Sequence, residues 1–323
     1  MKLFSYVTAN ASRLGVVIGD DCFDLNHADN RIADNMADFL EGGAAAMELA
    51  RETVAGIKNG STAATPLTAV TLGAPVPEPS SCRDAYAFRQ HVETARRNRG
   101  VPMIPEFDRF PVFYFTNHRA VFGPGDIHCM PDHLDELDFE LEVAVVLNRQ
   151  GRNIRVVDAD RYIAGYMIMN DFSARRLQME EMKLSLGPAK GKDFATAMGP
   201  YLVTPDELAA YRVDAKAGHV GDAYQLEMTC AVNGVRVSKG NFADMHWTFA
   251  EIIERVSYGV DVYPGDIIGS GTVGTGCFLE LNGTKKRENP LYEPQWLKPG
   301  DTVEMEVTGL GRLVNEVKLE NAS

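Results

Sequence analysis

The stretch Leu137–Asn148 reads LDFELEVAVVLN, and its pattern decides how the rest of the chain is interpreted. Acidic residues occupy every second position at Asp138, Glu140 and Glu142, and the stretch then becomes wholly apolar. In a β-strand, residues two apart point to the same face and lie roughly 6.5–7 Å from each other. The pattern therefore predicts carboxylates held side by side at the start of a strand whose second half lies in the core.

Two interpretations of these acids remain open from the residues alone. They can line a solvated outer face, because antiparallel sheets often alternate polar and apolar positions. They can also form a metal site, since buried like charges must take up protons or bind a cation. An all-oxygen ligand set favours Mg²⁺, Ca²⁺ or Mn²⁺ over zinc. Asp171, which directly follows another apolar stretch, favours the metal site.

The composition restricts the class of protein. The 323 residues are 45% apolar, enough for one large domain or two modest ones. The formal net charge of −13 would repel nucleic acid and anionic membranes, so we expect neither as a partner. The sequence shows no secretory signal and no apolar run near the ~18 residues that span a bilayer. Five scattered cysteines without a CxxC pair favour reduced thiols and a cytoplasmic location.

The order of expected elements predicts the fold class. Strand patterns are many, helical patterns are few, and the strand–helix alternation of a doubly wound sheet is missing. We therefore expect an α+β fold that is mainly β, built from rolled or sandwiched mixed sheets. A proline-rich connector suggests a boundary near residue 75. It would separate a small β-rich N-terminal domain, residues 1–75, from a larger domain, residues 76–323.

Four segments give specific local predictions. Residues 35–60 have a helical pattern interrupted at Gly42–Gly43. Residues 245–260 predict the clearest later helix. Alternating runs on either side of Asn233–Gly234 predict a β-hairpin. The segment CFLEL, residues 277–281, alternates over a short span and predicts a late strand.

Polar residues that follow Asp171 suggest further site residues. Arg175 and Gln178 come four and seven positions after Asp171, a spacing that would place all three on one face of a helix. Lys192 lies in the glycine-containing segment GPAKGKDFAT, and Thr196 follows four positions later. A lone lysine in such a loop is usually solvated, and the GxxxxGK[ST] signature of a phosphate-binding loop is absent.

Six motifs, taken in order, resemble those of the fumarylacetoacetate hydrolase family. They are Asp84 with His91 seven positions later, Glu140-Leu141-Glu142, NDFSARRLQ at 170–178, GKDFAT at 191–196, Gly271-Thr272, and Glu280 in CFLEL. The match covers about residues 80–310. One such motif would be weak, whereas six in sequence order are specific. The first 75 residues resemble, with lower specificity, a small β-rich domain that some members carry.

The resemblance implies a role for each matched residue. It implies that four acids hold one divalent cation, Mg²⁺ or Ca²⁺ with Mn²⁺ possible: Asp84, Glu140, Glu142 and Asp171. It implies that His91 is the general base and Glu280 its orienting partner. Stabilisation of the developing oxyanion is implied for Arg175, Gln178 and Lys192. Substrate contacts are implied for Tyr86 and Thr272. Lys192 and Thr196 are also candidates for a second metal site or a structural role, and Asp138 is left as a strand-entry or supporting residue.

The function implied is metal-dependent hydrolysis of a carbon–carbon bond in a fumarylacetoacetate-like β-diketo acid, in aromatic (tyrosine-type) catabolism, by a homodimer. The same site could instead serve fumarylpyruvate or acylpyruvate hydrolysis, or decarboxylation, isomerisation or hydration of a 2-oxo-enoate. A non-catalytic metal-binding protein of this fold would not require the histidine–glutamate pair. The chain departs from the family pattern at Met182 and Gly100, which are substrate-selecting positions, so the acyl group stays open.

Overall fold

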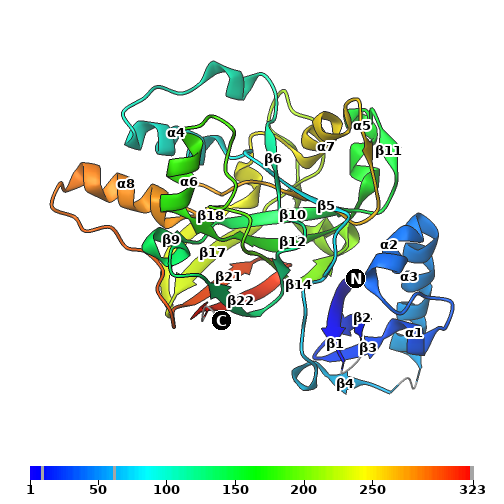
Figure 1. The fold of residues 1–323 in the computed structure, drawn as a ribbon. Coiled ribbons are helices and arrows are strands. Elements are labelled where there is room, and N and C mark those ends of the chain that lie inside the picture. Colours follow the sequence, from blue (N-terminus) through cyan, green and yellow to red (C-terminus); the bar gives the residue numbers. More distant parts are fainter. Residues whose placement is uncertain (9–10, 61–62, 321–323) are drawn as a thin grey trace.

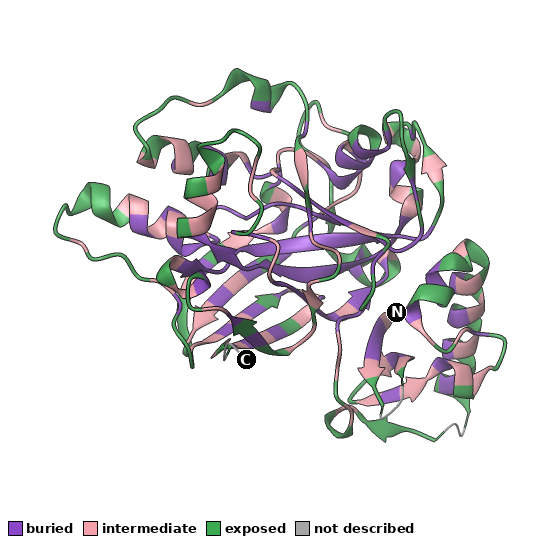
Figure 2. Ribbon diagram, in the orientation of Figure 1, coloured by how far each residue is buried: buried purple, intermediate pink, exposed green. Residues whose placement is uncertain are grey.

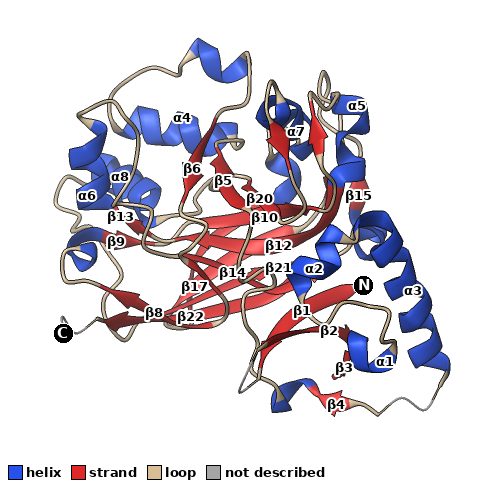
Figure 3. Ribbon diagram, turned by 45° about the vertical axis from the view of Figure 1, so that its right-hand side comes forward, coloured by secondary structure: helices blue, strands red, loops and turns tan. Residues whose placement is uncertain are grey.

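Two large β-sheets packed against each other form the centre of the molecule (Figure 1). A computed structural model describes residues 1–8, 11–60 and 63–320. Helices gather around the rims of the sheets, and the N-terminal segment lies beside one end (Figure 3). The expected α+β fold with sandwiched mixed sheets is confirmed.

The larger sheet contains eleven strands within the described residues. Its path runs through β4 (Thr65–Pro66), β3 (Asp21–Asp24), β2 (Ser12–Ile18), β1 (Lys2–Val7), β14 (Thr196–Val203), β12 (Ile163–Asp171), β10 (Leu141–Leu147), β20 (Asp266–Gly269), β5 (Ser81–Ala85) and β6 (Phe113–Thr116). Strand β7 (Val121–Phe122) pairs with β14 off this path. The β20–β5 and β7–β14 pairs are parallel and the others antiparallel, so the sheet is mixed.

The second sheet runs in the order β18 (Val235–Asn241), β17 (Glu227–Val232), β21 (Thr302–Val307), β22 (Gly311–Leu319) and β8 (Gly125–Cys129). Three short pairs complete the strands: β11 (Gly151–Arg152) with β19 (Asp261–Val262), β13 (Ser173–Ala174) with β9 (Leu137–Asp138), and β15 (Arg212–Val213) with β16 (Ala223–Tyr224). The predicted hairpin is confirmed as β17–β18. Asn233 and Gly234 both adopt positive φ, which a tight two-residue hairpin turn requires.

The α-helices are α1 (Leu25–Ala28), α2 (Met36–Glu41), α3 (Gly43–Asn59), α4 (Arg89–Asn98), α5 (Val156–Ala159), α6 (Arg175–Met182), α7 (Phe249–Ser257) and α8 (Phe278–Glu288). Short 3-10 helices cover Leu67–Ala69, Pro105–Asp108, His133–Glu136, Asp160–Tyr162, Pro205–Tyr211 and Phe242–Asp244. The predicted helix break is confirmed between α2 and α3. The predicted later helix is α7, which begins with a capping box of Thr248 and Glu251. No helix of the described residues has the length and apolarity to cross a bilayer.

The strand predicted for CFLEL is wrong, because this segment begins helix α8. The Asp138 carboxylate accepts the backbone N–H groups of Phe278 and Leu279 at 2.7 and 2.9 Å. These are two of the N–H groups that a helix start leaves without partners. Basic residues in the last turn favour the other end of the helix. A five-residue alternation cannot reveal a cap that comes from a residue 140 positions earlier.

Strand β10 is buried on both faces and separates two cores (Figure 2). Its odd-numbered residues, from Leu141 to Leu147, join the cluster between the two large sheets. Ala144 and Val146 join a second cluster on the opposite face, shared with the N-terminal segment. Glu142 belongs to this second face by its position in the strand. The apolar half of β10 therefore anchors the end that carries the carboxylates.

The N-terminal segment extends the large sheet and is not a separate layer. Strand β1 pairs with β14, with Leu3 opposite Leu202, and helices α1 to α3 accompany β1 to β4. The segment is therefore mixed α and β in content. Its residues share a core with Met167 and Leu202 of the larger part. The domain boundary near residue 75 stays a prediction, and the sheet is continuous across it.

We expect Met167→Ala to weaken the attachment of the N-terminal segment. Met167 is fully buried in the shared core, and truncating such a side chain removes about 2–5 kcal/mol of unfolding free energy. Denaturant unfolding followed by circular dichroism would measure the loss. Val235→Ala, at a 67% exposed hairpin position, is the control. A loss as small for Met167→Ala as for the control would contradict a shared core.

Candidate metal centre

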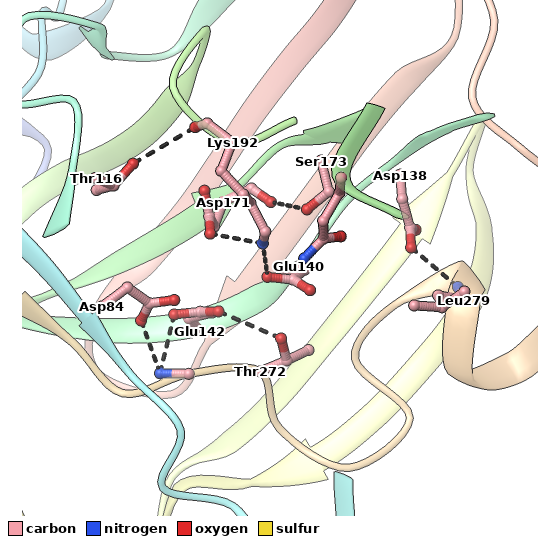
Figure 4. Close-up of polar contacts among 12 residues, drawn as sticks. Asp84, Thr116, Asp138, Glu140, Glu142, Asp171, Ser173, Lys192, Thr272 and Leu279 are labelled. Atoms are coloured by element: carbon pink, nitrogen blue, oxygen red, sulfur yellow. Dashed lines mark hydrogen bonds and ion pairs between the residues drawn. The ribbon is translucent and has the colours of Figure 1, made fainter. Parts of the chain in front are cut away.

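Four carboxylates from three strands meet in one buried cluster (Figure 4). Asp84 lies in β5, Glu140 directly precedes β10, Glu142 lies at the start of β10, and Asp171 ends β12. One oxygen from each carboxylate lies within 4.8 Å of the others, and all four residues are buried. The strand order β12-β10-β20-β5 brings them together. The structure thus unites the four acids that the resemblance implied, and the solvated-face interpretation is wrong.

Two of these carboxylates share a single backbone donor. The Gly271 N–H donates to Asp84 Oδ1 at 3.0 Å and to Glu142 Oε2 at 3.1 Å. Burial, and then the nearby Asp171 carboxylate, raises the pKa of Asp84 to about 7. Burial and the Asp84 carboxylate raise the pKa of Glu142 well above its ordinary value. This pair of acids therefore needs either a proton or a cation.

Lys192 serves the other side of the cluster. Its buried ammonium group forms ion pairs with Glu140 and, at 2.7 Å, with Asp171 Oδ2 (Figure 4). Burial alone would raise the pKa of Glu140, but the charges of Lys192 and Arg175 lower it to about 2. Tyr114 donates its hydroxyl to Asp171 Oδ2 at 2.5 Å. Lys192 is therefore a buried member of the site, and the expectation of a solvated loop lysine is wrong.

The residues present fit a divalent cation. Five buried acids face two buried cations, so full ionisation leaves 2 − 5 = −3 in this region. A divalent ion would reduce that to −1. Asp171 Oδ1 is buried and has no hydrogen-bond partner among the described residues. An all-carboxylate set suits hard cations such as Mg²⁺, Mn²⁺ and Ca²⁺.

Arg175 links the cluster to helix α8. Its Nε donates to Asp138 Oδ2 at 2.9 Å, its Nη2 to Glu140 Oε1 at 2.6 Å and its Nη1 to Gln178 Oε1 at 3.0 Å. Asp138 in turn caps α8, so one carboxylate serves both partners. Asp138 is more than a strand-entry residue. In the sequence, the only signal for this role of Asp138 was its place as the first of the three alternating acids.

The predicted base and its partner lie beside the carboxylates. His91 Nδ1 lies 2.6 Å from Glu280 Oε2, which also accepts the Thr275 N–H at 3.0 Å. Both side chains are buried. Ligand atoms of His91, Glu140 and Cys277 lie within 4.8 Å of one another, which places the imidazole next to the carboxylate cluster. With Nδ1 engaged, Nε2 remains for chemistry.

The other predicted residues surround this centre. Thr272 Oγ1 donates to Glu142 Oε1 at 3.3 Å, so here it supports a carboxylate. Thr196 lies opposite Asp171 in the β12–β14 pair and is buried. The Tyr86 ring packs edge-on against His91 with ring centroids 5.7 Å apart. Burial raises the pKa of the Tyr86 hydroxyl to about 12. Their substrate and metal roles stay predictions.

Comparison with known proteins identifies the family. The model of the fumarylacetoacetate hydrolase C-terminal domain matches residues 81–318. The mitochondrial oxaloacetate tautomerase Fahd2a of Rattus norvegicus is 32% identical over 304 residues, which cover 93% of this chain and 85% of the relative. The chain belongs to the fumarylacetoacetate hydrolase family.

Solved structures of this family have the same fold. The fumarylacetoacetate hydrolase of Exiguobacterium antarcticum superposes with a TM-score of 0.70 at 23% identity, covering 99% of this chain and 100% of the other. The maleylpyruvate hydrolase of Sphingobium sp. SYK-6, solved with manganese(II) and pyruvate, gives a TM-score of 0.71 at 22% identity with the same coverage. At these identities the likeness shows the fold alone.

We expect Glu142→Gln to weaken binding of a divalent cation by roughly a hundredfold or more, because a ligand charge is lost from a buried all-oxygen site. Isothermal titration calorimetry with Mn²⁺ would measure the change. Glu227→Gln, on an exposed strand position, is the matched control. Equal affinities in the two variants would remove Glu142 from the ligand set.

Cation binding should also depend on pH in a defined direction. The pKa of Asp84 is about 7 and that of Glu142 is raised, so a proton resides on this pair below about pH 7. The cation must displace that proton. Its affinity should therefore fall about tenfold for each pH unit by which the pH is lowered, for each proton displaced. Titrations in buffers with different ionisation enthalpies would count the protons. A cation affinity that does not change between about pH 5.5 and pH 8 would contradict the prediction.

Proposed function

We propose that the protein hydrolyses a carbon–carbon bond in a β-diketo acid of the fumarylacetoacetate or acylpyruvate type. The observation that carries this proposal is the buried His91–Glu280 pair next to the carboxylate cluster. A histidine held at Nδ1 by a carboxylate is arranged to activate water through Nε2. Family membership supports the same reaction class. The cation would be Mg²⁺, Mn²⁺ or Ca²⁺.

Hydrolysis of such a bond needs a stabilised carbanion as the leaving group. A divalent cation in the carboxylate cluster would polarise the diketone oxygens and stabilise the enolate charge. Lys192 has three N–H donors, of which Glu140 and Asp171 engage two, so one remains for a developing oxyanion. Gln178 extends this polar side of the site through its contact with Arg175.

His91 would move the proton in both halves of the reaction. Its Nε2 would take a proton from water as the oxygen attacks the carbonyl carbon. The imidazolium would then return that proton to the carbon of the departing enolate. Glu280 keeps the ring in one orientation throughout, and the Thr275 N–H keeps Glu280 in place. Arg175 donates to the Asp138 and Glu140 carboxylates through Nε and Nη2 and to the Gln178 amide oxygen through Nη1, so its part would be to hold Glu140.

Tautomerisation of a 2-oxo dicarboxylic acid such as oxaloacetate is the second candidate. The rat relative that covers 93% of this chain is named for that reaction. His91 would then remove a proton from the carbon beside the keto group, the enolate oxygen would take up a proton to give the enol, and no water would attack. That relative is also named as mitochondrial, so a cytoplasmic location stays a prediction. The homodimer and the place in aromatic catabolism are likewise predictions.

A substrate panel separates the two candidates. We expect C–C cleavage of fumarylacetoacetate, fumarylpyruvate or an acylpyruvate in the presence of Mg²⁺ or Mn²⁺, followed by loss of diketone absorbance and by NMR of the products. Enol–keto exchange of oxaloacetate would be measured on the same preparation. Exchange of oxaloacetate without cleavage of any diketo acid would overturn hydrolysis and favour the tautomerase.

His91→Asn should lower kcat by about 10²–10⁴-fold, because it removes the general base. Mn²⁺ affinity should stay unchanged, since His91 is not one of the four carboxylate ligands. Initial rates and calorimetry on the same variant would test both halves. His128→Asn, on exposed strand β8, is the control. A His91→Asn enzyme with normal kcat would exclude His91 as the base.

A further inference from the structure

Five arginines surround two adjoining cavities where the N-terminal segment meets the larger part of the chain. A cavity of about 220 Å³ is lined by Arg51 from α3 together with Arg149 and Arg161. A second, of about 430 Å³, is lined by Arg149, Arg152, Arg155 and Arg161. The cavities share Arg149 and Arg161, and the surrounding elements are α3, β11 and α5 (Figure 1).

The charge of this region opposes that of the whole chain. Asp158 and Asp206 line the two cavities, so the lining residues sum to 5 − 2 = +3; Glu48 and Asp261, which pair with Arg51 and Arg152 just outside the lining, lower the local sum to +1 in a chain of net charge −13. Asp206 lies 3.3 Å from the N-terminal ammonium, whereas Asp158 pairs with two of the five arginines, Arg155 at 2.6 Å and Arg161 at 3.6 Å. Arg149 pairs with no carboxylate in the described part of the chain. Cavities lined by one sign of charge concentrate counter-ions.

The inner wall adds a buried polar group that lacks a partner. Asn148 lines the smaller cavity and is 7% exposed, and its Oδ1 has no hydrogen-bond partner among the described residues. Rotation of the amide about its Cβ–Cγ bond exchanges oxygen and nitrogen, so the group can present an acceptor or two N–H donors to a ligand. Met47, Ile163 and Ala164 give the same cavity an apolar floor.

We propose that these cavities bind a small organic polyanion that carries phosphate or carboxylate groups, and that the anion joins α3 to the larger part of the chain. Guanidinium groups match both kinds of anion through paired N–H donors. Arg51 lies on α3, whereas Arg149 and Arg161 flank strands of the central sheet. A bound anion therefore contacts both sides of the junction at once.

The site is separate from the carboxylate cluster. Strand β10 begins beside Glu142 and ends one residue before Asn148, which places the two regions roughly 20 Å apart along the strand. In Figure 1, α5 and β11 lie at the opposite end of the sheet from α6 and α8. The anion site therefore does not depend on the identity of the catalysed reaction.

Calorimetric titration of the metal-free full-length protein with pyrophosphate and with citrate, at constant ionic strength, tests the proposal. We expect saturable binding of at least one probe, and the preferred probe shows whether phosphate or carboxylate chemistry is recognised. The double variant Arg149→Ala/Arg161→Ala should bind at least about tenfold more weakly. Arg236→Ala, an exposed arginine on β18, should bind like the parent. Binding of neither probe, or equal binding by the double variant, would overturn the proposal.

Hydrogen exchange tests the junction itself. The bound probe should slow exchange in peptides from α3 (Gly43–Asn59) in the parent protein. Arg51→Ala should remove most of the protection of α3 but keep most of the affinity for the probe, because Arg149 and Arg161 still hold the anion. Unchanged exchange of α3 at saturating probe would show that the anion does not connect the two parts, and would overturn that half of the proposal.

Discussion

The burial of Asp138, which holds Arg175 and caps α8 with the same carboxylate, is the constraint on which the site depends. A buried charge is tolerated only with a partner and with its remaining hydrogen bonds satisfied. Asp138 meets this condition with one guanidinium and three backbone N–H groups. Glu280 lies in the first turn of the helix that Asp138 caps, so the position of Glu280 beside His91 follows from the start of the carboxylate strand.

The cluster divides its charge unevenly, and this division determines where a cation is needed. Glu140, between Lys192 and Arg175, is ionised at any ordinary pH because its pKa is about 2. Asp84 and Glu142 share one backbone donor, and neither forms an ion pair with a cationic side chain among the described residues. Burial raises both pKa values, helped by the Asp171 carboxylate for Asp84 and by the Asp84 carboxylate for Glu142. A divalent ion would offset the two charges of this second side, while Lys192 and Arg175 reduce the charge of Asp138, Glu140 and Asp171 to 2 − 3 = −1.

Much of this arrangement could be predicted from the sequence, because the signals were local. The alternation and apolar run of residues 138–147 predicted a strand with side-by-side carboxylates and a core half, and the family resemblance then favoured a metal site over a solvated face. Asn233–Gly234 predicted the separate β17–β18 hairpin. What could not be predicted depends on contacts between distant residues. The helix at 278–288 needs a cap from Asp138, and β1 pairs with a strand near residue 200. No local pattern in either segment records its distant partner.

Both of the proposed reactions, hydrolysis and tautomerisation, would use the buried network, so we expect the residues that separate them to lie at its edge. The loop between α6 and Lys192 is held at both ends by Glu181, at the end of α6. Its carboxylate accepts the backbone N–H groups of residues 189–191, just before Lys192. Between these anchors, Leu184 and Leu186 are 82% and 95% exposed. Met182, where fumarylacetoacetate-cleaving members have tyrosine, begins this exposed stretch. The tip of this loop contributes little to the core, so its residues can change without disturbing Lys192. If the loop reaches the substrate, as we propose, a change of substrate or reaction would leave the carboxylate cluster and His91 in place.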